Sequence, residues 1–151
     1  MPNGRTAQRE VVEHADVVAI VPLDGQGNVV MVRQYRLPAG ATLLEVPAGG
    51  VDEGEDMPAA AQRELQEETG YRADRLERLG GLFVSPGYCT EFVHLFLATG
   101  LTEDALEADP DEDITVERVP LAEAVRLAAA GEIRDGKSIA GILLAARRLG
   151  R

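Results

Sequence analysis

The sequence is poor in cysteine, aromatic residues and long apolar runs, and these shortages exclude several classes of protein. Its one cysteine, Cys89, cannot form an intramolecular disulfide and leaves no cysteine metal cluster, which fits a reducing compartment. No apolar run approaches the ~18 residues that a membrane-spanning helix needs, and the polar first ten residues lack the apolar core of a secretory signal. We therefore expect a cytoplasmic protein with no membrane partner.

Positive charge is also scarce. Fifteen Lys and Arg stand against 26 Asp and Glu, a formal net charge of −11, and such a field disfavours binding to nucleic acids. A phosphate-containing substrate would need local help, which a bound divalent cation can supply. The length of 151 residues fits one domain spanning residues 1–151.

Val- and Ile-rich segments separated by turn signals predict a mixed α/β domain. We expect strands over 10–22 and 28–35, joined as a β-hairpin by the turn at 24–28, and further strands over 43–46, 76–84, 92–98 and 114–119. Helices are expected over 59–69 (Asp56 and Gly70 as caps), 121–130 (closed by Gly131) and 138–149 (opened by Ser138). This order of elements favours a layered α/β domain over a simple βαβ repeat.

Three carboxylates gather on the first of these helices. At 100° per residue, Glu64, Glu67 and Glu68 occupy one arc of roughly 100°, while Leu65 begins a neighbouring stripe that can face the core. A solvated acidic face is the simplest explanation of such a pattern. Because like charges at i, i+4 repel each other, a hard cation such as Mg²⁺ or Mn²⁺ is the alternative explanation.

The surrounding spacing favours the cation. The pattern G-x5-E-x7-R-E-U-x-E-E-x-G-U, where U is a bulky apolar residue, is filled in this sequence by Gly49, Glu55, Arg63, Glu64, Leu65, Glu67, Glu68, Gly70 and Tyr71. The stretch resembles the signature of the Nudix hydrolases throughout. Its one departure is Tyr71, where an aliphatic residue is more common.

The resemblance implies an α/β/α sandwich with a mixed β-sheet that hydrolyses a nucleoside diphosphate linked to another group. Glu64, Glu67 and Glu68 would hold Mg²⁺, with Mn²⁺ as a substitute, together with the backbone carbonyl of Ala48. Glu67 and Glu68 would also serve in catalysis, and Arg63 would orient a catalytic carboxylate. Arg63 lies four residues before Glu67, which is within pairing reach on a helix.

Glu55, by contrast, precedes the helix, so we expect it to cap or tether the loop.

A second feature concerns the substrate. Pro86 follows Gly70 by sixteen residues, which resembles the ADP-ribose pyrophosphatase branch of the family, although a Pro-Gly hairpin turn would look the same. That branch implies that Arg36 contacts the substrate phosphates and that Glu91 lies near the terminal ribose. Tyr88 could stack on a base or ribose. Arg36 as a surface cation and Glu91 as a strand start are the plainer alternatives.

Two further expectations follow from the same branch. It places another catalytic carboxylate in the acidic loop before Ile114, where we choose Glu112 over Asp109, Asp111 and Asp113. Its members form dimers, so we expect a homodimer. They pair additional N-terminal strands across the dimer, whereas this sequence has only about nine residues before its first predicted strand, so whether strands are exchanged stays open. The predicted reaction is Mg²⁺-dependent cleavage of ADP-ribose or a related ADP-sugar to AMP and a sugar phosphate.

Two alternatives stay open. One keeps the chemistry with another nucleoside diphosphate sugar, a dinucleotide cofactor or a nucleoside triphosphate as substrate. The other is a non-catalytic ligand sensor.

Overall fold

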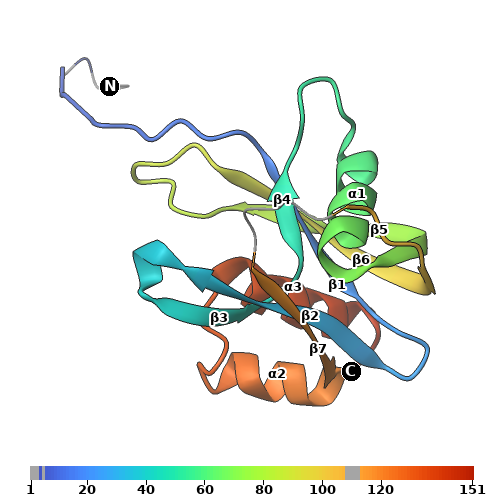
Figure 1. Cartoon of the computed structure of the whole chain (residues 1–151). Helices are drawn as coiled ribbons and strands as arrows, with labels where there is room; N and C mark the ends of the chain where they lie inside the picture. The colour runs from blue at the N-terminus through green and yellow to red at the C-terminus, as the bar shows by residue number, and fades with distance from the viewer. Residues whose placement is uncertain (1–3, 5, 108–112) are drawn as a thin grey trace.

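A computed structural model describes residue 4 and residues 6–107 and 113–151 (Figure 1). The strands are β1 (Val17–Pro22), β2 (Asn28–Arg36), β3 (Ala41–Glu45), β4 (Ala48–Gly50), β5 (Tyr71–Phe83), β6 (Phe92–Glu103) and β7 (Ile114–Pro120). The helices are the short 3-10 helix η1 (Leu37–Ala39) and the α-helices α1 (Met57–Thr69), α2 (Leu121–Ala129) and α3 (Gly136–Arg148). Among the described residues, no helix has both the length and the apolar character needed to cross a bilayer.

The strands form two sheets. One has the order β4-β1-β6-β5 and is mixed, because β1 runs parallel to β6 and antiparallel to β4; the other has the order β3-β2-β7 and is antiparallel. The expected hairpin between the first two strands is wrong, since only an isolated bridge between Leu23 and Val29 joins them. The reason is that β1 is buried at every position and pairs on both edges, so no edge is left for β2.

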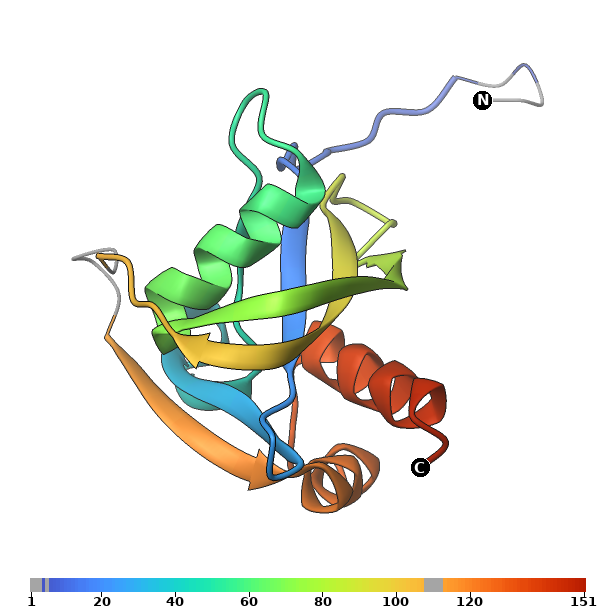
Figure 2. The ribbon, with the colours of Figure 1, turned by 90° about the vertical axis from the view of Figure 1, so that its right-hand side faces the viewer.

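Helices cover both faces of the four-stranded sheet, which gives the expected α/β/α layering (Figure 2). On one face Ile20 and Phe96 pack with Leu65 of α1. On the other face Leu95 packs with Ile142 of α3. Alternate residues of each strand point to opposite faces, so the central strands must be apolar throughout. This packing holds α1 against one face of the sheet.

Local signals set the helix ends, with one exception. The Asp56 carboxylate accepts from the Ala59 amide at 2.8 Å, and Gly70 closes α1 with a φ of 76°, as predicted. The expected Ser138 cap is wrong, because Asp135 caps α3 by accepting from the Ser138 amide at 2.9 Å. The Ser138 side chain is buried and accepts from the Val46 amide instead.

Strand ends were the least predictable part. The first strand begins at Val17, not at residue 10, and residues 6–13 are exposed chain. Strands β5 and β6 are longer than expected, and the short strand β4 was missed because Gly49 and Gly50 give no strand signal. Strand β4 lies beside α1 and carries Ala48, whose carbonyl is one of the predicted metal ligands.

Candidate active site

Helix α1 holds two of the three pattern glutamates in nearly buried positions. Glu64 is 8% exposed and Glu68 is 7% exposed, whereas Glu67 is only half-buried. A solvated acidic face would leave all three in water, and ionised carboxylates are costly to bury unless they are paired. The simplest explanation of the pattern is therefore inconsistent with the burial of Glu64 and Glu68.

Strand β4 approaches these two carboxylates through its backbone. A Cβ atom placed on Gly49 would lie 2.1 Å from Cδ of Glu64, a separation that real atoms cannot adopt. The Ala48 amide donates to the Glu68 carboxylate, at 3.4 Å from each oxygen. The first glycine of the pattern is thus required because a carboxylate occupies the space that a side chain would need.

Arg63 is the centre of an ion-pair network. It donates from Nε and Nη2 to the two oxygens of Glu55 at 3.0 and 2.9 Å, and from Nη1 to Glu64 at 2.6 Å and Glu67 at 3.1 Å. It also donates to the Gly50 carbonyl at 2.9 Å. The hydrogen bond from Arg63 is the main cause that holds the pKa of Glu55 below its ordinary value.

Glu55 also accepts from the Asp52 amide at 3.1 Å, so it tethers the loop before α1, as expected. The predicted pairing of Arg63 with Glu67 is confirmed as a contact. Together these bonds fasten the loop to the helix.

The donor set suits Mg²⁺ by its chemistry. Carboxylate oxygens and a backbone carbonyl are the hard ligands that Mg²⁺ prefers. Among the described residues, no group of three or more His, Cys, Asp or Glu side chains converges as a metal shell. Mg²⁺ commonly takes one or two carboxylates and keeps several waters, so Glu64 and Glu68, packed against the backbone of β4, fit it without a third.

Arg36 is held by a buried acid that the sequence analysis did not assign. Its Nε and Nη2 donate to Glu45 at 2.9 and 2.8 Å, and Glu45 is 1% exposed. Burial raises the pKa of Glu45, but hydrogen bonds from Arg36 and the charge of Lys137 outweigh that effect and leave the pKa below its ordinary value. The hydrogen bonds with Glu45 are the main cause that raises the pKa of Arg36, and the charge of Glu68 on α1 adds to the effect.

The signal for Glu45 was present in the sequence. An acid within the apolar segment 43–46 must be paired if the strand is buried.

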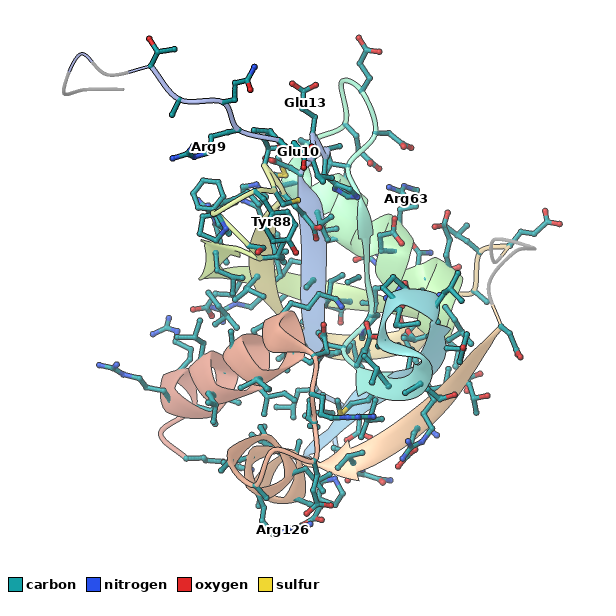
Figure 3. All side chains as sticks on the ribbon, turned by 90° about the vertical axis from the view of Figure 1, so that its left-hand side faces the viewer. Arg9, Glu10, Glu13, Arg63, Tyr88 and Arg126 are labelled. Carbon is teal, nitrogen blue, oxygen red and sulfur yellow. The ribbon has the colours of Figure 1, made fainter. Side chains whose placement is uncertain are left out.

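The loop 84–91 lies apart from Arg63 of α1. Figure 3 shows Tyr88 and Arg63 on opposite sides of strand β1. Pro86 and Tyr88 are exposed, and Glu91 lies 4.0 Å from Nδ1 of His14. The substrate role of Pro86, Tyr88 and Glu91 stays a prediction.

The acidic loop is only partly described. Glu112, the chosen loop carboxylate, lies outside the described residues, as do Asp109 and Asp111. Asp113 is described and exposed.

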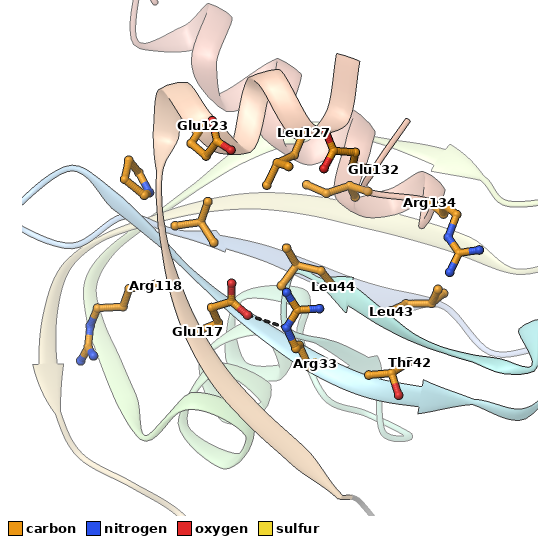
Figure 4. Close-up of a pocket in the computed structure, with 13 residues that line it drawn as sticks. Arg33, Thr42, Leu43, Leu44, Glu117, Arg118, Glu123, Leu127, Glu132 and Arg134 are labelled. Carbon is orange, nitrogen blue, oxygen red and sulfur yellow. Dashed lines mark hydrogen bonds and ion pairs between the residues drawn. The ribbon is translucent and has the colours of Figure 1, made fainter. Parts of the chain in front are cut away.

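A groove of about 520 Å³ lies between α2 and the three-stranded sheet (Figure 4). The groove is lined by side chains of both charges, and two of them, Arg33 and Glu117, pair with each other. The residues that line it include none of the pattern residues. We therefore place the candidate active site at α1 and β4.

Comparison with known proteins identifies the family. The NUDIX domain model matches residues 12–141. The chain is 40% identical over 140 residues to an ADP-ribose pyrophosphatase of Bacillus subtilis (strain 168), covering 91% of this chain and 76% of that protein. It is 46% identical over 146 residues to an ADP-ribose pyrophosphatase of Mycobacterium tuberculosis (strain ATCC 25618 / H37Rv), covering 95% of this chain and 70% of that protein.

Two further relatives extend the comparison. A methanol dehydrogenase activator of Bacillus methanolicus is 38% identical over 144 residues, covering 94% of this chain and 78% of that protein. A crystal structure of an ADP compounds hydrolase superposes with a TM-score of 0.82 at 28% identity, covering 89% of this chain and 72% of that chain. With the sequence pattern, the layered fold and the buried glutamates in agreement, the chain belongs to the Nudix family of hydrolases.

Proposed function

We propose that this Nudix hydrolase cleaves the diphosphate linkage of ADP-ribose or a related ADP-sugar with Mg²⁺, giving AMP and a sugar phosphate. The observation that carries the proposal is the pair of buried carboxylates, Glu64 and Glu68, packed against the backbone of β4. The ADP-sugar class is supported by the two relatives named ADP-ribose pyrophosphatase, each of which matches more than nine-tenths of this chain.

In the proposed mechanism the side chains divide the work. Glu64 and Glu68, with the Ala48 carbonyl, would hold Mg²⁺, which when bound neutralises phosphate oxygens and lowers the pKa of a coordinated water. Arg63 donates to Glu67 and orients its carboxylate, and the role of Glu67 as a further metal ligand and catalytic group stays a prediction. Arg36 presents its guanidinium to the diphosphate, since a planar fork of donors matches phosphate oxygens.

Proton removal from the attacking water requires a carboxylate base. We assign that base to the acidic loop, with Glu112 as the candidate.

Incubation of the purified protein with ADP-ribose and Mg²⁺ tests the proposal. We expect AMP and ribose phosphate in equal amounts, and loss of both products when EDTA removes the cation. Absence of AMP at micromolar enzyme, while another nucleotide in the same panel is hydrolysed, would reject the ADP-sugar assignment. The panel should include other nucleoside diphosphate sugars, dinucleotide cofactors and nucleoside triphosphates.

A sensor role is the second candidate, and the relative named as a methanol dehydrogenase activator is the observation that favours testing it. A sensor would bind ADP-ribose and release no product from any member of the panel. For an enzyme, Glu68→Gln should abolish most of the metal-dependent turnover. Glu53 is exposed in the loop before α1, so Glu53→Gln makes the same charge change and is a matched control that should keep normal turnover.

We also propose that the protein is a homodimer. Large apolar side chains are exposed where the N-terminal segment meets the loop 84–91, among them Val12 at 53%, Phe83 at 55% and Tyr88 at 59%. Exposed apolar clusters of this kind are typical of association surfaces. Light scattering after gel filtration should give about twice the monomer mass of 16.2 kDa, and a monomer would reject the proposal.

A further inference from the structure

Lys137 is the only lysine in the chain, beside fourteen arginines. It lies at the start of α3, and its side chain is 12% exposed. Its Nζ atom is 2.6 Å from Oε2 of Glu45 and 3.0 Å from Oδ1 of Asp135. A compact, largely covered ammonium thus lies between two carboxylates.

Glu45 links this lysine to Arg36. The carboxylate accepts both guanidinium bonds from Arg36, and its Oε2 atom is shared between Arg36 and Lys137. Arg36 sits at the end of an exposed hairpin, next to Tyr35 at 57% and Leu37 at 79% exposed. A two-point bond fixes the plane of the guanidinium, which such a hairpin could not do alone.

The same turn of α3 also reaches the segment that leads into β4. The Ser138 hydroxyl is fully buried, donates to the capping Asp135, and accepts from the Val46 amide at 2.8 Å. Val46 lies two residues before Ala48, whose amide contacts Glu68. One helix start therefore holds both Arg36 and the backbone that packs on the α1 glutamates.

We propose that the first turn of α3 is a positioning element of the active site. Lys137 acts through Glu45 to orient Arg36, and Ser138 acts through Val46 to set the backbone at Ala48 and Gly49. The inference rests on the proposed function, because it takes Arg36 as a group that meets the substrate diphosphate. The residues of α3 act through Glu45 and Val46 and do not themselves contact the substrate.

The contacts of Lys137 and of Ser138 predict different kinetic changes. Lys137→Met should raise KM for ADP-ribose by about tenfold and change kcat by less than about twofold, because it loosens a binding group. Ser138→Ala should lower kcat by about fivefold and leave KM within about twofold, because it loosens the backbone beside the metal ligands. Arg147→Met, which removes a positive charge from an exposed site on the same helix, is the matched control and should change neither constant.

A double-mutant cycle separates positioning from a general loss of stability. In an Arg36→Ala background, Lys137→Met should add less than about twofold in kcat/KM, whereas Ser138→Ala should keep its full effect. If Lys137→Met costs as much in that background as in the wild type, the relay through Glu45 to Arg36 is wrong.

The single lysine provides a readout that does not depend on activity. In NMR spectra of protein labelled with ¹³C-lysine, the folded protein gives one ε-methylene signal, from Lys137. Unfolded protein would give a separate signal. Arg36→Ala should shift the Lys137 signal and Arg147→Met should leave it in place, even if Lys137→Met itself fails to fold. An unmoved signal in Arg36→Ala overturns the inference. A shifted signal in a protein that cleaves no nucleoside diphosphate instead supports the relay and rejects the proposed function.

Discussion

The segment 49–70 and the loop 84–91 are organised in opposite ways. In the first, side chains fix one another: Arg63 alone reaches Glu55, Glu64, Glu67 and the Gly50 carbonyl. In the second, backbone groups make most of the bonds, to the loop itself and to the N-terminal segment at Val12, while Tyr88 points to solvent. The first segment carries the groups expected for the reaction, and the second carries those expected for substrate choice.

This difference teaches where substitutions should act. Groups that must meet a reacting atom need a fixed geometry, because small displacements are costly in rate. Groups that choose among substrates tolerate change, and exposed loops supply them. Substitutions of the interlocked groups in 49–70 should therefore lower kcat, and substitutions of exposed side chains in 84–91 should alter KM and the choice of nucleotide.

The largest expected effect is at Glu68. Glu68→Gln should lower kcat for ADP-ribose several hundredfold, on the order of 4 kcal/mol, because the proposed metal ligand loses its charge. Steady-state kinetics at saturating Mg²⁺ measure the change, with Glu53→Gln as the control. A loss smaller than about tenfold would remove Glu68 from the metal site.

Gly49→Ala tests the close approach of β4 to α1. The added methyl group would occupy the position of the Glu64 carboxyl, so we expect kcat to fall by about 50-fold and the protein to be less stable. Gly50→Ala is the matched control, since nothing lies within 4 Å of its added atom. Equal kinetics for the two variants would contradict the packing argument.

Glu55→Gln should have a smaller effect, about tenfold in kcat/KM, because Arg63 loses an ionic partner and not its whole network. It should also change the response to acid. The pKa of Glu55 is below its ordinary value of 4.5 in the folded protein, so its ion pair stabilises the fold above that pH and is lost as the pH falls through the folded pKa.

Urea unfolding at several pH values measures this second effect. Between neutral pH and pH 3 the wild type should lose more unfolding free energy than Glu55→Gln. Parallel pH profiles would show that Arg63 does not stabilise the charged form of Glu55.

Tyr88→Ala should have the smallest effect on turnover. We expect kcat within about twofold, KM for ADP-ribose raised about fivefold, and weaker discrimination against other nucleoside diphosphate sugars. Tyr35→Ala, an equally exposed tyrosine at 57%, is the control. If Tyr88→Ala lowers kcat more than KM rises, the division of labour between the two regions is wrong.

The sequence predicted helix α1 and its two ends well because their signals are local. Helix periodicity, the Asp56 cap, the Gly70 end and the pairing of Arg63 with Glu67 all depend on residues within a few positions of one another. The layered α/β class followed from the order of elements.

What the sequence did not predict depends on contacts between distant residues. The apolar run of β1 shows that the strand is buried, but not which strands pair with it, so the hairpin expectation was wrong. Glu45 and Lys137 are 92 positions apart and meet only after both sheets and α3 have packed. Asp135 replaced Ser138 as the cap because tertiary packing recruited the serine to Val46.

The bond between Ser138 and Val46 bears on the order in which the protein can mature during synthesis. A nascent chain emerges from its N-terminus, so the whole glutamate pattern leaves the ribosome about 70 residues before the first turn of α3 does. Until that turn arrives, the backbone ahead of β4 lacks one of its supports and Glu45 lacks its lysine. Competence of the nascent enzyme should therefore appear late and abruptly.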